Sequence, residues 1–198
     1  NLERHIENIG KFGVPVIVAI NDYVSDTEKE HAAIIDYCQN IGVQCKISSH
    51  WEKGGKGATD LAEEVAKIAD SNSAEFKTLY DNKMSLWDKT QYIAQNIYGA
   101  AEIIADKKIR NQFQKLEDDG FGEYPICMAK TQYSFSTDPL LMGAPSGHDV
   151  PIKEVRLSAG AEFVVVVCGE VMTMPGLPRI PASENIDVDD NGLIQGLF

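Results

Sequence analysis

The sequence predicts an α/β fold, built from strand–helix repeats with a mainly parallel sheet and a small β-rich subdomain at the C-terminal end. Two apolar runs rich in β-branched residues, 14–20 and 43–47, are typical of strands that are buried on both faces. Each run is followed by a segment of helical periodicity, and the connections are short. This order favours parallel neighbouring strands joined by right-handed crossovers.

The other elements follow from periodicity and from helix start and stop signals. We expect helices over 2–9, 26–40, 60–70, 85–98 and 106–118, and further strands over 101–105, 124–130, 152–157 and 162–167. The last two strands are joined by only four residues, which predicts an antiparallel pair. We therefore divide the chain into an α/β domain over 1–130, a long loop over 131–150 and a small β-rich subdomain over 151–198.

The composition excludes several classes of protein. Eighteen basic against 30 acidic side chains give a net charge of −12, so the chain lacks the basic excess of a nucleic-acid or anionic-membrane binder. No apolar run approaches the roughly 18–20 residues that span a bilayer. The four cysteines show no C-x-x-C spacing, and Cys127 and Cys168 lie in apolar runs where a buried thiol is expected. These features predict a cytoplasmic protein.

A glycine-rich segment, Gly54–Thr59, follows the second predicted strand. It is not a Walker phosphate loop, because Lys56 precedes a glycine and His50 stands where the first glycine should be. Binding of some other anion at the following helix start stays open. The histidines have no metal-ligand spacing, so we expect no metal site. The 187–192 segment resembles the opening of a calcium loop but lacks its closing glutamate, which favours a turn.

Two aromatic residues come directly after the two predicted parallel strands. Tyr23 follows the first strand and Trp51 the second, so both rings should rise from the same edge of the sheet, where open α/β sheets bind ligands. The rings could hold a flat heteroaromatic group between them, or they could pack under their own loops. The polar segment Lys130–Ser136 follows another strand and could line the same edge.

Several long segments resemble formate–tetrahydrofolate ligase, also called formyltetrahydrofolate synthetase. The resemblance covers essentially the whole chain and is carried by Asn1–Asn21, Met128–Ser136, Val155–Gly160, Val171–Pro178 and Asn185–Phe198. It is limited to the C-terminal portion of that enzyme, whose members are more than twice this length. The first residues already have helical spacing, which indicates a piece of a longer polypeptide.

The resemblance implies the chemistry of the whole enzyme. The family joins formate to tetrahydrofolate with ATP and Mg²⁺, through formyl phosphate, to give 10-formyltetrahydrofolate. Its phosphate loop and the groups that activate formate lie upstream, so this chain should hold no catalytic residue, bind no cofactor firmly and be inactive alone. The remaining N-terminal part is the implied partner, within a homo-oligomer when the enzyme is full length.

The resemblance also implies which residues bind folate. Two stacking aromatics of the family match Tyr23, where phenylalanine is common, and Trp51. We add Asn21 before the pair, Lys53 and Lys56 to attract the glutamate tail, and a border formed by Lys130, Thr131 and Gln132. The alternative is a non-catalytic binding or subunit-assembly module. An exposed Trp51 favours ligand binding, whereas a Trp51 buried under its own loop favours assembly.

Overall fold

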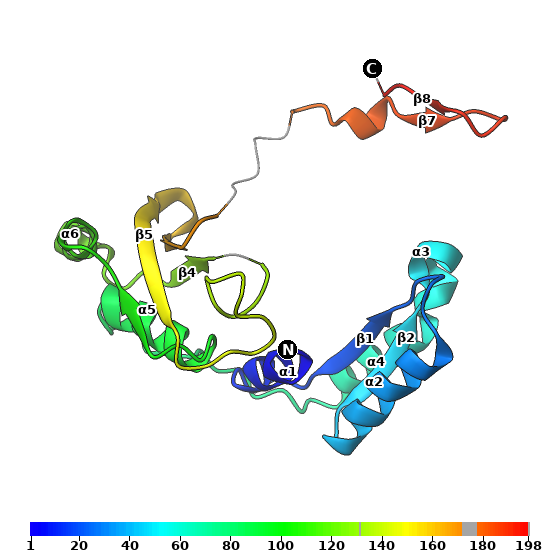
Figure 1. Ribbon diagram of the computed structural model, residues 1–198, viewed down its shortest axis with the longest axis horizontal. Helices are drawn as coiled ribbons and strands as arrows, with labels where there is room; N and C mark the ends of the chain where they lie inside the picture. Colours follow the sequence, from blue (N-terminus) through cyan, green and yellow to red (C-terminus); the bar gives the residue numbers. More distant parts are fainter. Residues whose placement is uncertain (131, 172–177, 198) are drawn as a thin grey trace.

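The computed structural model describes residues 1–130, 132–171 and 178–197 (Figure 1). Its helices are α1 (Leu2–Gly10), α2 (Glu28–Asn40), α3 (His50–Lys53), α4 (Thr59–Asp70), α5 (Leu86–Asn96) and α6 (Lys107–Leu116). Its strands are β1 (Ile17–Asn21), β2 (Gln44–Ser48), β3 (Glu102–Ile104), β4 (Ile126–Ala129), β5 (Asp149–Ser158), β6 (Phe163–Cys168), β7 (Asp187–Val188) and β8 (Ile194–Gln195). The predicted α/β class is confirmed, with a small antiparallel strand pair near the C-terminus.

The first sheet consists of β1 and β2, which pair in parallel from Ile17 opposite Gln44 to Asn21 opposite Ser48. The predicted parallel neighbours are therefore confirmed. Helices α2 and α4 both contact β2. Helix α2 begins at Glu28 rather than at residue 26, because Thr27 and Glu30 form a reciprocal capping box at its start.

The second sheet has four strands in the order β3-β5-β6-β4. Strand β5 is parallel to β3 and antiparallel to β6, as the short link between β5 and β6 predicted, and β4 is parallel to β6. Helices α5 and α6 pack on this sheet and share its apolar core, which includes Leu86, Phe113, Val150 and Val166. The parallel pairs are thus distributed over two sheets.

The expected boundary at 131–150 falls within this second sheet. Residues 151–168, which the sequence analysis assigned to a separate C-terminal subdomain, form its two central strands. Strands β3 and β4 have only three and four residues. Strand β3 pairs with β5 and β4 pairs with β6, and both partners follow the long loop in the sequence. Backbone groups of such short strands need a neighbour to pair with, which explains why the sheet spans the loop.

The described part of the long loop, 132–148, contains no helix or strand and is mostly exposed, apart from a buried stretch at 134–136. Ser134 and Ser136 are buried, and their hydroxyls accept hydrogen bonds from the backbone N–H groups of Ser136 and Asp138. The Ser134 hydroxyl also donates to the carbonyl of Leu141. These hydrogen bonds between side chains and backbone replace the backbone–backbone hydrogen bonds that a helix or a strand would supply.

The turn predicted near the C-terminal end is present between β7 and β8. One carboxylate oxygen of Asp189 accepts the backbone N–H groups of Asn191 at 2.9 Å and Leu193 at 3.0 Å. The hydrogen bond from Leu193 is the main cause that lowers the pKa of Asp189. The carboxylate therefore closes the turn.

The cysteine predictions are half right. Cys168 is fully buried, and burial raises the pKa of its thiol to about 12. Cys127 is exposed, contrary to the prediction, because β4 is an edge strand and successive side chains alternate between its faces.

Among the described residues, no helix is both long and apolar enough to cross a membrane.

Candidate functional site

Tyr23 and Trp51 meet at the carboxyl edge of the β1–β2 sheet. Their ring centroids lie 6.3 Å apart and their planes differ by 24°. Tyr23 is 57% exposed and Trp51 is 50% exposed, so each ring keeps about half of its surface open to solvent. The placement of both rings at one edge follows from the parallel pairing of β1 and β2.

The distance between the two ring centroids is close to the distance that a third aromatic ring needs in order to stack between them. Stacked carbon atoms prefer separations of about 3.5 Å, so a flat group between two rings needs about 7 Å. The observed centroid separation is 6.3 Å. A small outward movement of either exposed ring would admit an aromatic ligand without repacking the core.

The segment that carries Trp51 is helical, which corrects the glycine-rich loop expected there. Residues 50–53 form the single turn α3, and Gly54–Ala58 form a 3-10 helix that leads into α4. The backbone N–H of Ser49 donates to the carbonyl of Gly57 at 3.0 Å. A Cβ at position 57 would lie 2.5 Å from the Ser49 carbonyl oxygen, so this close turn requires glycine.

Polar contacts tie both rings to the segment between β1 and α2. The indole N–H of Trp51 donates to the backbone carbonyl of Asp22, and the hydroxyl of Ser49 donates to the Asp22 carboxylate at 2.7 Å. The backbone N–H of Tyr23 donates to the Asp26 carboxylate at 3.0 Å. Asn21 donates from its side-chain amide to the Tyr23 hydroxyl at 3.1 Å. These bonds connect the two segments that carry the rings.

His31, from the first turns of α2, faces the same two carboxylates. Its Nε2 lies 3.3 Å from an oxygen of Asp22 and 3.8 Å from an oxygen of Asp26. This nitrogen is buried and makes no hydrogen bond of good geometry. The three groups also offer ligand atoms within 4.8 Å of one another, a cluster that spacing in the sequence did not reveal. The Asp22 carboxylate already accepts a hydrogen bond from Ser49, and the Asp26 carboxylate accepts one from the backbone of Tyr23. We therefore infer that the cluster holds together the two segments that carry Tyr23 and Trp51.

The predicted lysines beside Trp51 are solvent-accessible. Lys53 lies two residues after Trp51 on α3, with its side chain 59% exposed and its Nζ 3.7 Å from the carboxylate of Glu52. Lys56 is exposed on the following 3-10 helix. Both cations therefore stand on the same short helical stretch as Trp51, and both can reach solvent near the ring pair.

Two of the predicted border residues follow β4 and do not belong to the β1–β2 sheet. Lys130 and Gln132 follow β4, and Figure 1 shows β4 and α3 in different arms of the molecule with α1 between them. Both residues line a hollow of about 530 Å³ that His5 and Tyr98 also line. The Nζ of Lys130 lies 5.2 Å from the centroid of the Tyr98 ring, and burial lowers its pKa. Thr131 lies outside the described residues.

Sequence reasoning found the ring pair and missed its tethers. Asp22 and Ser49 follow the two strands as directly as the rings do, so the same edge argument could have included them. His31 gives no such signal, because it lies inside a helix and meets Asp22 only through the tertiary fold.

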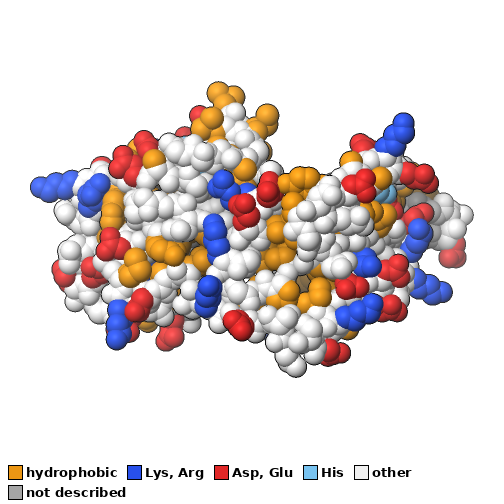
Figure 2. Space-filling model, turned by 90° about the horizontal axis from the view of Figure 1, so that it is seen from below, with side chains coloured by type: hydrophobic (Ala, Val, Ile, Leu, Met, Phe, Trp, Pro, Cys, Tyr) orange, Lys and Arg blue, Asp and Glu red, His pale blue; other side chains and the backbone are white. Residues whose placement is uncertain are grey.

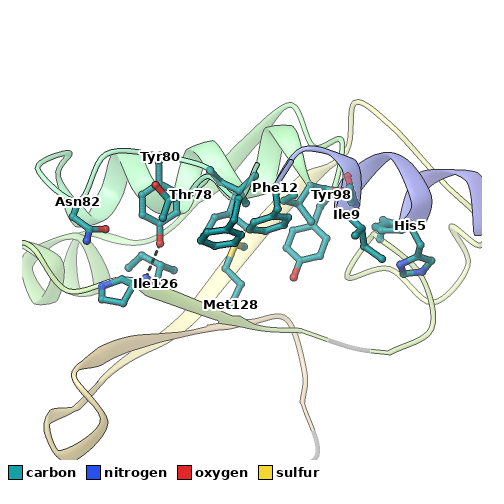
Figure 3. Close-up of a pocket in the computed structure, with 16 residues that line it drawn as sticks. His5, Ile9, Phe12, Thr78, Tyr80, Asn82, Tyr98, Ile126 and Met128 are labelled. Carbon is teal, nitrogen blue, oxygen red and sulfur yellow. Dashed lines mark hydrogen bonds between the residues drawn. The ribbon is translucent and has the colours of Figure 1, made fainter. Parts of the chain in front are cut away.

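A second feature that the sequence did not reveal is an apolar cavity of about 540 Å³ (Figure 3). It lies between α1, the segment that precedes α5, α5 itself and the start of β4. Helical spacing places His5 and Ile9 of its α1 wall on neighbouring positions of one face. The other walls could not be assigned to the same cavity without the fold.

Comparison with known proteins agrees with the resemblance. A sequence model of the family formate–tetrahydrofolate ligase matches residues 1–198. The enzymes of that name from Pelagibacter ubique (strain HTCC1062), Granulibacter bethesdensis (strain ATCC BAA-1260 / CGDNIH1) and Ruegeria pomeroyi (strain ATCC 700808 / DSM 15171 / DSS-3) are 54%, 56% and 57% identical over 198 residues. These matches cover 100% of the chain but only 35–36% of each relative. The chain therefore belongs to the formate–tetrahydrofolate ligase family.

Proposed function

We propose that this chain supplies the folate-binding side of an ATP-dependent ligase that joins formate to tetrahydrofolate. The product is 10-formyltetrahydrofolate, formed through formyl phosphate with release of ADP and phosphate. The observation that carries the proposal is the Tyr23–Trp51 pair, two half-exposed and nearly parallel rings 6.3 Å apart at a sheet edge. A flat aromatic part of the folate enters between the rings.

The charges around the pair suit the rest of the folate. Its glutamate tail carries carboxylates, and Lys53 and Lys56 are exposed cations on the same helical stretch as Trp51. In a chain of net charge −12, two local cations give the tail a favourable place to lie. Asn21 holds the Tyr23 hydroxyl by donating a hydrogen bond to it. The border role of Lys130, Thr131 and Gln132 stays a prediction.

The chain leaves phosphoryl transfer to the part of the ligase that it does not cover. Its one glycine-rich segment folds as a helical turn, and Thr59 donates its hydroxyl to the Lys56 carbonyl at 3.2 Å. Phosphoryl transfer depends on positioning and charge stabilisation by loops that cradle phosphates. We therefore assign Mg²⁺–ATP and formate to the remaining part of the polypeptide, and expect no formate- and folate-dependent ATP hydrolysis from these 198 residues alone.

The competing function is a non-catalytic assembly module. In that case the two rings would pack under their own segments or against another subunit and would bind no folate. The half exposure of Trp51 favours the ligand-binding function, because a ring buried under its own helix could not stack on a ligand. The further properties implied by the family, a cytoplasmic location and a homo-oligomeric whole enzyme, belong to the same proposal.

The decisive experiment replaces Trp51 in the whole ligase. Lost stacking and apolar contact cost about 1.5–3 kcal/mol, so Trp51→Ala should raise the tetrahydrofolate dissociation constant roughly ten- to hundredfold while the ATP constant stays nearly unchanged. Trp51→Phe should recover part of the affinity, because it keeps a stacking face. Equilibrium binding of both substrates and the melting temperature are measured for each variant.

The chain offers a matched control in its other tryptophan. Trp87 packs edge-on against Phe113 and under the guanidinium of Arg110, far from the pair in sequence and on the other sheet. Trp87→Phe should lower the melting temperature without a selective effect on folate. A folded Trp51→Ala enzyme with an unchanged folate constant would remove Trp51 from the site.

A further inference from the structure

The apolar cavity beside α1 has the character of a protein-binding groove. Sixteen residues line it, and among them there is no Asp, Glu, Lys or Arg, although the chain carries 48 charged side chains. Figure 3 shows side chains from α1, the segment 76–82, α5 and β4 converging on it, with Phe12 and Tyr98 near its centre. In this acidic chain, an uncharged surface of this size is a local exception.

One wall of the groove holds a large aromatic side chain out in solvent. Phe76 is 69% exposed, and its ring stacks on that of Phe12 at a centroid distance of 6.3 Å with planes 10° apart. Two backbone hydrogen bonds hold this arrangement, from the Glu75 N–H to the Gly13 carbonyl at 2.8 Å and from the Lys77 N–H to the Phe12 carbonyl at 2.9 Å. The exposed ring is therefore held in place by the backbone.

Gly13 makes that attachment possible. Its φ is +70°, and a Cβ at this position would lie 2.1 Å from the carbonyl oxygen of Glu75. Only glycine combines this backbone conformation with so close an approach. Figure 2, which views the molecule from below, shows hydrophobic side chains exposed in several separate patches on this face. A fold that fixes apolar groups at its surface in this way is typical of an interface.

Two of the polar side chains that line the groove are already hydrogen-bonded within the chain. The Asn8 side chain donates to the Ile97 carbonyl at 2.8 Å and accepts from Lys11 at 3.0 Å. The Tyr80 hydroxyl accepts the backbone N–H of Ile126 at 3.0 Å. A charged metabolite would lose its hydration here without gaining matching partners, whereas apolar side chains of a polypeptide would lose nothing.

The identity of the partner follows from how little of the ligase this chain contains. About two thirds of each curated relative lies outside the match, which covers 35–36% of their length. Helix α1 lies between the two arms of the molecule and is itself a wall of the groove (Figure 1). A segment in the same polypeptide has a high effective concentration at the groove, which favours it over a second copy.

We propose that the groove formed around Phe12 and Phe76 is the docking surface for apolar side chains of the ligase segment that this chain does not include. The groove then joins the folate-binding part to the part that handles ATP. This inference goes beyond the proposed function and does not depend on Tyr23 or Trp51, neither of which lines the groove.

Photo-crosslinking in the whole ligase tests the identity of the partner. A benzoylphenylalanine replaces Phe76, and a control enzyme carries it at Tyr37, an exposed aromatic of α2 outside the groove. The expected product is an intramolecular link from position 76 to a peptide outside these 198 residues, at least fivefold more abundant than from position 37. A link to a second copy, links confined to these 198 residues, or equal yields from both positions would overturn the proposal.

A substitution series gives an independent readout. Phe76→Asp should lower the melting temperature of the whole ligase by about 2–5 °C, and Phe76→Leu should restore most of it. Part of this effect comes from the stack of Phe76 on Phe12 within this chain, so the crosslink, and not the melting temperature, identifies what covers the ring. The folate dissociation constant should stay within twofold in both variants, which separates this test from the proposed folate site. A melting temperature that changes by less than 1 °C in Phe76→Asp would contradict the proposal.

Discussion

The molecule presents two aromatic pairs with the same spacing and different surroundings. The Tyr23–Trp51 rings and the Phe12–Phe76 rings both have centroids 6.3 Å apart, with planes 24° and 10° apart. Side-chain and backbone polar groups hold the first pair, through Asp22, Asp26 and Ser49. The second pair stands over a groove whose lining has no charged residue.

The comparison shows that ring spacing alone does not decide what an aromatic pair binds. Polar anchors and the nearby cations Lys53 and Lys56 suit a small ligand that has both a flat ring and carboxylates. A groove without acidic or basic lining residues, in which Asn8 and Tyr80 are already hydrogen-bonded, suits apolar polypeptide side chains. The neighbours of each pair, rather than its geometry, carry the functional distinction.

The largest expected effect comes from detaching the second pair from its backbone support. Gly13→Ala should destabilise the protein by about 2–4 kcal/mol, because it combines an unfavourable positive φ with loss of the bonds that hold Glu75 and Lys77. Urea unfolding of the whole ligase measures this change. Gly10→Ala is the control, since Gly10 ends α1 with open space around it, and it should be neutral or slightly stabilising. Equal effects of the two substitutions would contradict the explanation.

A reciprocal pair of truncations tests whether the two regions have separate roles. Tyr23→Ala should raise the folate dissociation constant roughly tenfold, since a lost stack is worth about 1–1.5 kcal/mol. Phe12→Ala should leave that constant within twofold and lower the melting temperature instead. Binding titrations and thermal unfolding of both variants provide the data. Equal losses of folate affinity from both substitutions would show that the two pairs form one site.

A smaller effect should come from the cluster that supports the first pair. His31→Leu removes the contact of His31 with Asp22 and Asp26 and leaves the two carboxylates without that partner. A partly exposed polar contact of this kind is worth about 0.5–1 kcal/mol, so folate affinity should fall two- to fivefold. His31→Gln, which can still donate to a carboxylate, should restore part of it. No change in folate affinity with His31→Leu would show that the rings keep their positions without the cluster.

The smallest effect is expected on the strand face that belongs to neither region. Ile126 and Met128 line the groove, so alternation places Cys127 on the opposite face of β4, where it is exposed. Alkylation at pH 8 should modify Cys127 first and leave folate affinity within twofold. Cys168 should react only on unfolding, because burial raises its pKa to about 12 and excludes the reagent. Mass spectrometry of peptides against time gives the order, and early labelling of Cys168 would contradict it.

Local pattern was sufficient for much of this molecule. The β-branched runs predicted β1 and β2, and their order along the chain predicted the parallel pairing that places Tyr23 beside Trp51. The short link before β6 predicted its antiparallel pairing with β5. These predictions succeed because strand alternation, short connections and crossover handedness are constraints between neighbours in the sequence. The family resemblance rested likewise on contiguous segments, and the sequence comparisons agree with it.

Other properties were decided only when distant segments met. The sheet that joins β3 and β4 to β5 and β6 crosses the loop at which the sequence suggested a boundary, because short strands take whichever partner completes their hydrogen bonds. Trp51 lies on a helical turn that Gly57 and Ser49 close from opposite ends. His31 meets Asp22, and Phe76 meets Phe12, through packing that no spacing rule encodes. The sequence by itself therefore determined the family, the strands and the placement of Tyr23 beside Trp51, whereas the tertiary structure decided the sheet order, the tethers and the groove, since these depend on contacts between residues far apart along the chain.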